Sequence, residues 1–426
     1  MKRSTAVLLS ICLVLGIAMT VLALYATDEG LAAIHEKLAL QKRQAAAAKA
    51  AELLGTDIAV DLGEMVELTR AEQLALLLGQ AAKPLLVLGI DLMIAGVMGL
   101  VRARIKRRRQ STRASTPNNT LGILLAFGVL CLNLALSTDK FLTAQNLLNV
   151  MQQISINFVI AVGMTFVIIS GGIDLSVGSN IALTGLLMAI LMKNYSVATA
   201  PAIAISLVFS AVVGLINGVM VARLDLPPFI ATLGMMSIAR GAAYTVTGGQ
   251  PLYTMPEAFT AISGRVRGVP LYAGLIMAAV FTLGWYMLRY TRQGRFTYAI
   301  GGNENCARLS GIDIGRVKML VYTLSGLCCG VAALLLTSRL DSALPTNADG
   351  QEMDAIAAVV IGGTSMKGGE GGMIGTLIGI LIIGIISNGL NLLGVAQGPQ
   401  KMVKGLIIVV AVIIDVLRRK AAEAGK

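Results

Sequence analysis

One stretch of the chain places polar and charged residue types between two long apolar runs. It reads IISGGIDLSVGSNIALTG, residues 168–185, with a glycine pair, an aspartate and serines. A charged side chain near the centre of a membrane helix costs roughly 2.5–3.5 kcal/mol, so Asp174 at that depth requires a structural role. Each glycine is about 1 kcal/mol worse than alanine inside a helix. We therefore expect a helix break, with one helix ending at Gly171–Gly172 and another starting with Asp174 or Ser176 as its N-cap.

The alternative is an ordinary loop outside the membrane, in which the carboxylate caps a helix in water. A second stretch, VVIGGTSMKGGEGGMIGTLIG at 359–379, favours the break. Its Gly362–Gly363 pair precedes Gly369 with the spacing that separates Gly171–Gly172 from Gly178. Matching broken elements in two halves of a membrane protein indicate an internal structural repeat. We expect the two stretches to flank a central pathway.

Composition predicts a polytopic membrane protein built from helices. The chain has 426 residues, of which 56% are hydrophobic and 14% charged, and a mean hydropathy of +0.77. The basic residues behind the +12 net charge lie beside the apolar runs, which is the positive-inside pattern and argues against nucleic-acid binding. The five cysteines suggest no disulfide framework. His35 is the only histidine, so histidine-based catalysis, zinc sites and proton relays are not expected in the membrane region, and no metal or cofactor is expected.

Residues 1–115 are predicted to form an N-terminal extension with two membrane spans. The first apolar run, 6–26, has no A-x-A cleavage site after it and is interpreted as an uncleaved anchor. The second, 84–101, ends in the basic block 102–113, which should stay in the cytosol. The polar, partly helical segment between these runs should therefore be extracytoplasmic.

Residues 116–426 are predicted to form an all-α membrane core. Its apolar pattern gives about ten membrane helices or re-entrant elements, at 121–138, 153–171, 176–192, 200–222, 229–247, 270–290, 317–337, 353–362, 373–393 and 401–417. With the two N-terminal spans the number is even, which places both chain ends in the cytosol.

The loop at 291–316 carries several basic residues and should face the cytosol. Within it we expect a short helix that ends at Leu309, with Asn303 as N-cap and Gly311 as terminator. A freely solvated basic loop is the alternative. Apolar residues such as Ile300 among the polar ones favour docking to a cytosolic partner.

From about residue 121 to its end, the chain resembles the permease subunit of bacterial ABC importers for monosaccharides, most closely the ribose type. The resemblance implies a multi-pass protein of the bacterial inner membrane that imports a sugar, ribose in the first instance. It also implies a homodimer, a cytosolic ATP-binding subunit and an extracytoplasmic sugar-binding protein. The matching stretches are FLTAQNLLNVMQQISINFVIAVGMTFVIISGGIDLSVGS (141–179), GWYMLRYTRQGRFTYAIGGNENCARLSGI (284–312), DAIAAVVIGGTSMKGGEGGMIGTLIG (354–379) and SNGLNLLGV (387–395).

The resemblance also assigns residues to roles. A neutral sugar is better matched by hydroxyl and amide groups than by a bare carboxylate, so Asp174 is expected to cap a half-helix in the pathway. The other pathway candidates are Ser176, Asn180, Gly171, Gly172, Gly362, Gly363 and Asn391. The sequence departs from the family pattern at Asn305–Cys306, where ribose permeases have small apolar residues. The implied ATPase-coupling residues are Gly302, Asn303, Glu304, Arg308, Leu309, Ser310 and Gly311.

Two other function classes compete with this interpretation. A secondary transporter of a small polar solute also uses repeats and broken helices, but it would favour several carboxylates at membrane depth. A membrane enzyme would require a cluster of catalytic groups that the pattern lacks. There is no phosphate-binding loop of the GxxxxGK[ST] type, since Lys367 is followed by glycine. The chain is therefore expected to be a transport subunit without an ATPase site of its own.

Overall fold

The computed structural model describes residues 119–264 and 269–423. The chain divides into two units. The described part of the larger is 119–127, 139–264, 269–388 and 402–423, and that of the smaller is Gly128–Thr138 and Gly389–Lys401. The expected N-terminal spans and the extracytoplasmic segment between them lie outside the described residues.

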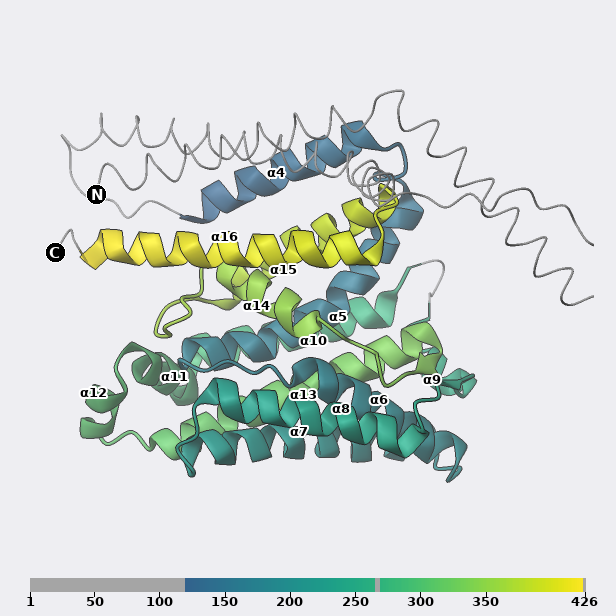
Figure 1. The fold of residues 1–426 in the computed structure, drawn as a ribbon, viewed down its shortest axis with the longest axis horizontal. Coiled ribbons are helices and arrows are strands. Elements are labelled where there is room, and N and C mark those ends of the chain that lie inside the picture. The colour runs from purple at the N-terminus through teal and green to yellow at the C-terminus, as the bar shows by residue number, and fades with distance from the viewer. Residues whose placement is uncertain (1–118, 265–268, 424–426) are drawn as a thin grey trace, which may run out of the picture. The chain divides into compact units, whose positions relative to one another are not determined.

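The larger unit is built from α-helices (Figure 1). Six described helices are long and apolar enough to cross a membrane, which confirms an all-α membrane protein but not the expected count of spans. These are α5 (Ala144–Ile169), α7 (Thr199–Ala222), α8 (Pro228–Thr247), α10 (Leu271–Tyr290), α13 (Ile314–Leu340) and α15 (Met373–Leu392). The remaining helices are α4 (Asn119–Ser137), α6 (Val177–Lys193), α9 (Glu257–Thr260), α11 (Arg292–Gly302), α12 (Glu304–Leu309), α14 (Gln351–Ile361) and α16 (Gln397–Glu423).

Three local features differ from the sequence expectation. α5 begins at Ala144, nine residues before its expected start, because the Thr143 side chain caps it by accepting the Asn146 N–H at 3.3 Å. Polar residues in the first turns of α5 hid this start from the apolar pattern. Helix α11 was not expected at all. The third is a two-residue antiparallel pair within the described ranges, β1 (Leu252–Tyr253) with β2 (Ser342–Ala343).

The core of the larger unit lies around α5 and α13. In the most apolar 18-residue stretch of α5, 94% of the residues are buried, whereas in that of α10 only 17% are. α13 packs against α5, α6 and α7, and glycines allow its crossing with α7 to be close. A Cβ added at Gly214 of α7 would lie 2.9 Å from the Cα of Gly326 of α13. Small residues at such crossings let helix backbones approach each other in membranes.

Both expected helix breaks are present, between α5 and α6 and between α14 and α15. α5 and α14 end in the same hydrogen-bonded motif, whose first residue beyond the cap is a left-handed glycine, Gly171 (φ +84°) or Gly363 (φ +93°). The N–H of each glycine donates to the carbonyl three residues back at 2.9 Å. The next N–H donates to the carbonyl five residues back, at 2.9 and 3.1 Å.

This equivalence corrects the expected alignment of the two breaks. The sequence spacing paired Gly171 with Gly362, but the backbone geometry pairs Gly171 with Gly363, one residue later. The spacing also paired Gly178 with Gly369. Gly178 lies inside α6, whereas Gly369 has a φ of +76° in the loop before α15. The breaks resemble each other in how the first helix ends, and differ in how the second begins.

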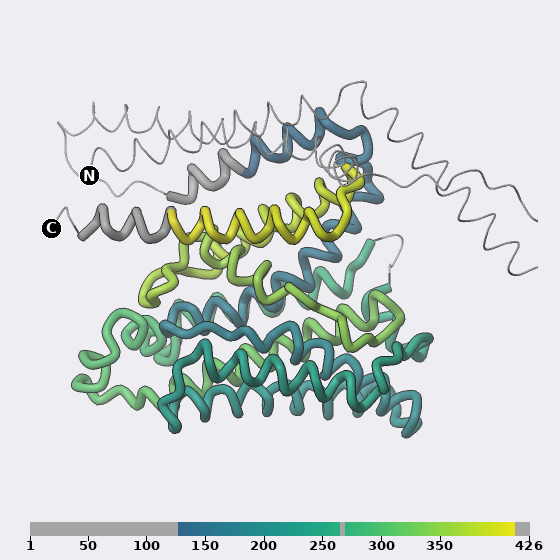
Figure 2. Tube along the Cα trace, viewed as in Figure 1, coloured from purple at the N-terminus to yellow at the C-terminus, as the bar shows by residue number. Residues whose placement is uncertain are grey.

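The two breaks and the end of α11 meet in a contact made by backbone alone, here called the glycine junction: Ile169, Gly301, Gly368 and Gly369. The Gly369 N–H donates to the Ile169 carbonyl at 2.9 Å. A Cβ at Gly368 would lie 2.8 Å from the Cα of Gly301, and one at Gly301 would overlap the Ile169 carbonyl oxygen. Figure 2 follows the chain through the larger unit, which contains all three segments. Only glycine lets these backbones come so close.

We predict that Gly301→Ala destabilises the protein while the neighbouring Gly302→Ala does not. The new methyl group at 301 would have to displace backbone, and overpacking of this kind costs about 1–3 kcal/mol. A Cβ at Gly302 meets nothing within 4 Å, and alanine is the better helix former. Thermal unfolding of the purified variants in one detergent measures the difference. Equal thermal unfolding midpoints for the two variants would show that the close backbone contact at Gly301 does not contribute to stability.

Candidate functional site

The first helix break is organised around Asp174, which is 1% exposed. Its Oδ1 accepts the Ser176 N–H at 3.0 Å and the Ser176 hydroxyl at 2.6 Å. Its Oδ2 accepts the Ser325 hydroxyl of α13 at 2.9 Å. The residue directly before α6 is Ser176, whose side chain makes no capping bond. Asp174 therefore stabilises the start of α6 from two residues before the N-cap and ties the break to α13.

The polar contacts continue from Ser176 into α6 and α7. Asn217 of α7 donates from Nδ2 to the Ser176 Oγ at 2.8 Å. Asn180 of α6 donates from Nδ2 to the Ser210 carbonyl at 3.3 Å, and its Oδ1 accepts the Ser210 and Thr184 hydroxyls at 3.2 and 3.1 Å. Ser176 and Asn180 are 1–2% exposed. Hydrogen bonding of buried polar groups is what makes their burial tolerable. These bonds link the helix break and α6 to α7, and one atom of the network, Asn217 Oδ1, is buried without a partner among the described residues.

The second part of the site is the short helix α12 and the ends that flank it. As expected, Asn303 is the N-cap, and its Oδ1 accepts the Cys306 N–H at 3.0 Å. Gly311 follows the helix with a φ of +78°. Glu304 forms ion pairs with Arg308 one turn away at 3.4 Å and with Lys318 of α13 at 2.8 Å.

The surface of α12 combines charge with an exposed apolar side chain. The side chains of Arg308 and Glu304 are 68% and 41% exposed, and Leu309 is 89% exposed. Pairs this exposed contribute little to stability on their own. The Lys318 side chain is 18% exposed, so its pair with Glu304 is the better shielded of the two and fixes the start of α12 against α13.

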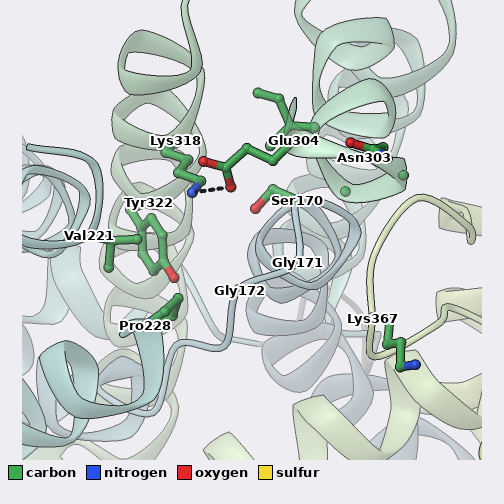
Figure 3. Close-up of a pocket in the computed structure, with 13 residues that line it drawn as sticks. Ser170, Gly171, Gly172, Val221, Pro228, Asn303, Glu304, Lys318, Tyr322 and Lys367 are labelled. Carbon is green, nitrogen blue, oxygen red and sulfur yellow. Dashed lines mark hydrogen bonds and ion pairs between the residues drawn. The ribbon is translucent and has the colours of Figure 1, made fainter. Parts of the chain in front are cut away.

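A cavity of about 350 Å³ connects the helix break with the start of α12 (Figure 3). Here the structure brings together two sets of residues that the sequence assigned separately, the pathway candidates Gly171 and Gly172 and the coupling candidates Gly302, Asn303 and Glu304. The other residues lining it are Ser170, Val221, Pro228, Ile300, Gly301, Lys318, Tyr322 and Lys367.

Other candidates do not line this cavity. Asp174, Ser176 and Asn180 lie in the buried network described above. Gly362 and Gly363 end α14, where a Cβ at Gly362 would collide with the backbone of Gly375 in α15. Asn391 belongs to the smaller unit, where its Oδ1 accepts the Gln400 Nε2 at 2.8 Å.

Sequence reasoning missed several polar residues that the structure assigns to this region. Ser325, Lys318 and Tyr322 lie in the long apolar helix α13, and no local pattern distinguishes them from other residues of that span. Tyr322 and Ser325 lie three residues apart and therefore on one face of α13. Nothing in the sequence, however, places that face against Asp174.

Two buried carboxylates of α14 lie outside the residues that the sequence pattern singled out. In α14, Glu352 and Asp354 are 9% and 6% exposed. Asp354 pairs with Lys404 of α16 at 2.7 Å, so this buried charge is compensated within the protein. Their acidic character suits the first turn of α14, where the helix dipole favours negative charge.

Comparison with known proteins finds permease components of transport systems. A protein-family model described as the permease component of a branched-chain amino acid transport system matches residues 146–412. The ribose import permease protein RbsC of Escherichia coli (strain K12) is 46% identical over 300 residues, 68% of this chain and 92% of that protein. RbsC of Bacillus subtilis (strain 168) is 45% identical over 305 residues, 71% and 94% of the two chains.

More distant relatives carry other sugars in their names. The fructose import permease protein FrcC of Rhizobium meliloti is 35% identical over 307 residues, 70% of this chain and 84% of that protein. No solved structure matches the chain. The family model covers more than half of the chain, and the relatives are covered over most of their length. The chain therefore belongs to the family of transport-system permease components that this model describes, together with the bacterial sugar import permeases.

Proposed function

We propose that this chain is the membrane permease subunit of an ATP-driven importer of ribose in the bacterial inner membrane. The observation that carries the proposal is 46% identity over 92% of a ribose import permease. The cavity between the helix break and α12 supports it, because a pathway residue and a coupling residue line the same space. The chain provides the route across the membrane, and ATP is hydrolysed on another subunit.

The partners follow from this role. A cytosolic ATP-binding subunit docks on α12, an extracytoplasmic binding protein delivers the sugar, and two copies of the permease form the assembly. Charged and exposed side chains on α12, with Leu309 at its end, suit docking to a groove on the ATPase. Partner selection through such charged surfaces is a general property of protein interfaces.

The finer architecture belongs to the same proposal. α4, α6, α14 and α16 add to the six long spans to give about ten core elements, of which α14 is re-entrant. Residues 1–115 form a separate extension with two more spans, and 116–426 the permease core with its coupling loop at 291–316. Asp174 acts as a cap in the first break, and the sugar is contacted by hydroxyl, amide and backbone groups.

The proposed function predicts sugar-dependent ATP hydrolysis by a defined set of components. Proteoliposomes that contain the permease, the ATP-binding subunit and a ribose-binding protein should accumulate labelled ribose only with ATP. Omission of the binding protein should remove most uptake. Uptake driven by an ion gradient without ATP would contradict the proposal and favour a secondary transporter.

The docking role of α12 predicts that Arg308→Glu abolishes ribose-stimulated ATP hydrolysis without affecting membrane insertion. Charge reversal at a desolvated interface costs several kcal/mol. The matched control is the triple variant Glu304→Arg/Arg308→Glu/Lys318→Glu, which restores both ion pairs of position 304 with reversed polarity but leaves position 308 reversed. If the triple variant regained wild-type hydrolysis, these pairs would be what matters, and the docking assignment would be wrong.

The capping role of Asp174 predicts different outcomes for two substitutions. Asp174→Asn keeps an oxygen for the Ser176 N–H and can donate from Nδ2 to the Ser325 hydroxyl, so it should retain folding and most ribose uptake. Asp174→Ala leaves these buried groups without their acceptor, at a cost of about 1–3 kcal/mol each. Uptake and thermal unfolding of both variants measure the contrast. Equal loss of uptake in both, at normal expression, would instead indicate a role for the negative charge.

A further inference from the structure

The cavity beside the helix break has the size and composition of a small-molecule site. Its volume of about 350 Å³ lies in the range of ligand pockets, roughly 300–1,000 Å³. Donors and acceptors of different kinds line it, among them the Glu304 carboxylate, the Lys318 ammonium and the Ser170 hydroxyl.

The charges around the cavity favour a neutral ligand. Lys318 and Glu304 neutralise each other in an ion pair at 2.8 Å. The Lys367 ammonium lies well apart from that pair (Figure 3). An anion would have to compete with Glu304 for Lys318, and a cation would find one carboxylate that is already paired. A molecule whose hydroxyl groups both donate and accept can contact the two members of the pair without separating them.

A buried hydroxyl beside the cavity provides an independent observation. Tyr322 lines the cavity and is 1% exposed, and its hydroxyl has no hydrogen-bond partner in the described part of the chain. The backbone N–H of Ile173 lies close to the oxygen of this hydroxyl, and the proton of the hydroxyl has no acceptor among the described residues. The hydroxyl lies against Gly172, a residue that also lines the cavity. Seven buried side-chain atoms in the described part of the chain lack a hydrogen-bond partner, and among their residues Tyr322 is the one that lines this cavity. A buried polar group without a partner calls for an explanation, such as an absent ligand.

We propose that this cavity binds a neutral, polyhydroxylated small molecule, the transported sugar, with the Tyr322 hydroxyl and the Glu304–Lys318 pair as its hydrogen-bonding groups. The site lies within one copy of the permease, next to the coupling helix. The proposal rests on the proposed function for the identity of the sugar. Because Glu304 also begins α12, a bound sugar contacts the element on which the ATPase docks, and its presence is sensed there directly.

The experiment measures binding of labelled D-ribose to the complex of permease and ATP-binding subunit in nanodiscs, without the binding protein. Tyr322→Phe keeps the ring and removes one hydroxyl, and Lys318→Met removes the ammonium. We expect each to weaken binding roughly three- to tenfold, as the loss of one hydrogen bond implies. Tyr244→Phe, at a 44% exposed tyrosine of α8, should bind ribose as the unaltered protein does.

A second arm uses sealed proteoliposomes with the ATPase subunits outside, where only the cytosolic face meets the added ribose. Binding in both arms supports a site that fills from the cytosol, and binding in nanodiscs alone supports one that fills from the pathway. Thermal unfolding of Tyr322→Phe should match the unaltered protein, which separates a ligand contact from a structural role.

Three results would overturn the inference. These are undetectable ribose binding, equal binding by Tyr322→Phe and the unaltered protein, and tighter binding of ribose 5-phosphate than of ribose. In each case, binding-protein-dependent uptake that remains normal would leave the proposed function standing. Loss of ribose uptake by the unaltered complex would instead contradict the proposed function.

Discussion

The structure depends on close backbone contact at the glycine junction. The Gly369 N–H bonds the Ile169 carbonyl at 2.9 Å, and Gly301 lies against the same carbonyl. This contact joins the end of α5, the loop before α15 and the end of α11, which are distant in the sequence. Hydrogen-bonding groups at the ends of broken helices must be satisfied inside the protein when water is scarce, and here one break supplies the acceptor and the other the donor.

The junction gives the cavity its position and places α12 beside it. Because α11 ends against the first break, Asn303, where the chain leaves α11, lines the same cavity as Gly171 and Gly172. Glu304 then reaches Lys318 of α13, so α12 is fixed at one end by an ion pair and exposed along its outer side. A few packed contacts therefore connect α12 with the helix break.

Asp174 illustrates how hydrogen bonds from neighbouring residues can accommodate a buried carboxyl group. Three hydrogen bonds, two from Ser176 and one from Ser325, replace the water that a carboxylate would lose on burial. The sequence indicated a capping role because an aspartate near the start of a helix has a local meaning. It did not indicate Ser325, which lies 151 positions away, because no local pattern encodes a contact over that distance.

The sequence alone determined the features that depend on neighbouring residues. These include the apolar spans, both helix breaks, the cap at Asn303 and, through extended similarity, the permease family. Only the tertiary structure decided that the breaks correspond through Gly171 and Gly363 instead of Gly362. It also decided that residues from the two candidate sets, Gly171 and Gly172 from one and Gly302, Asn303 and Glu304 from the other, line one cavity. The buried Tyr322 hydroxyl beside this cavity has no partner among the described residues. The reason is physical: periodicity and caps act within a few residues, whereas backbone approach and buried hydrogen bonds are settled by which helices pack together.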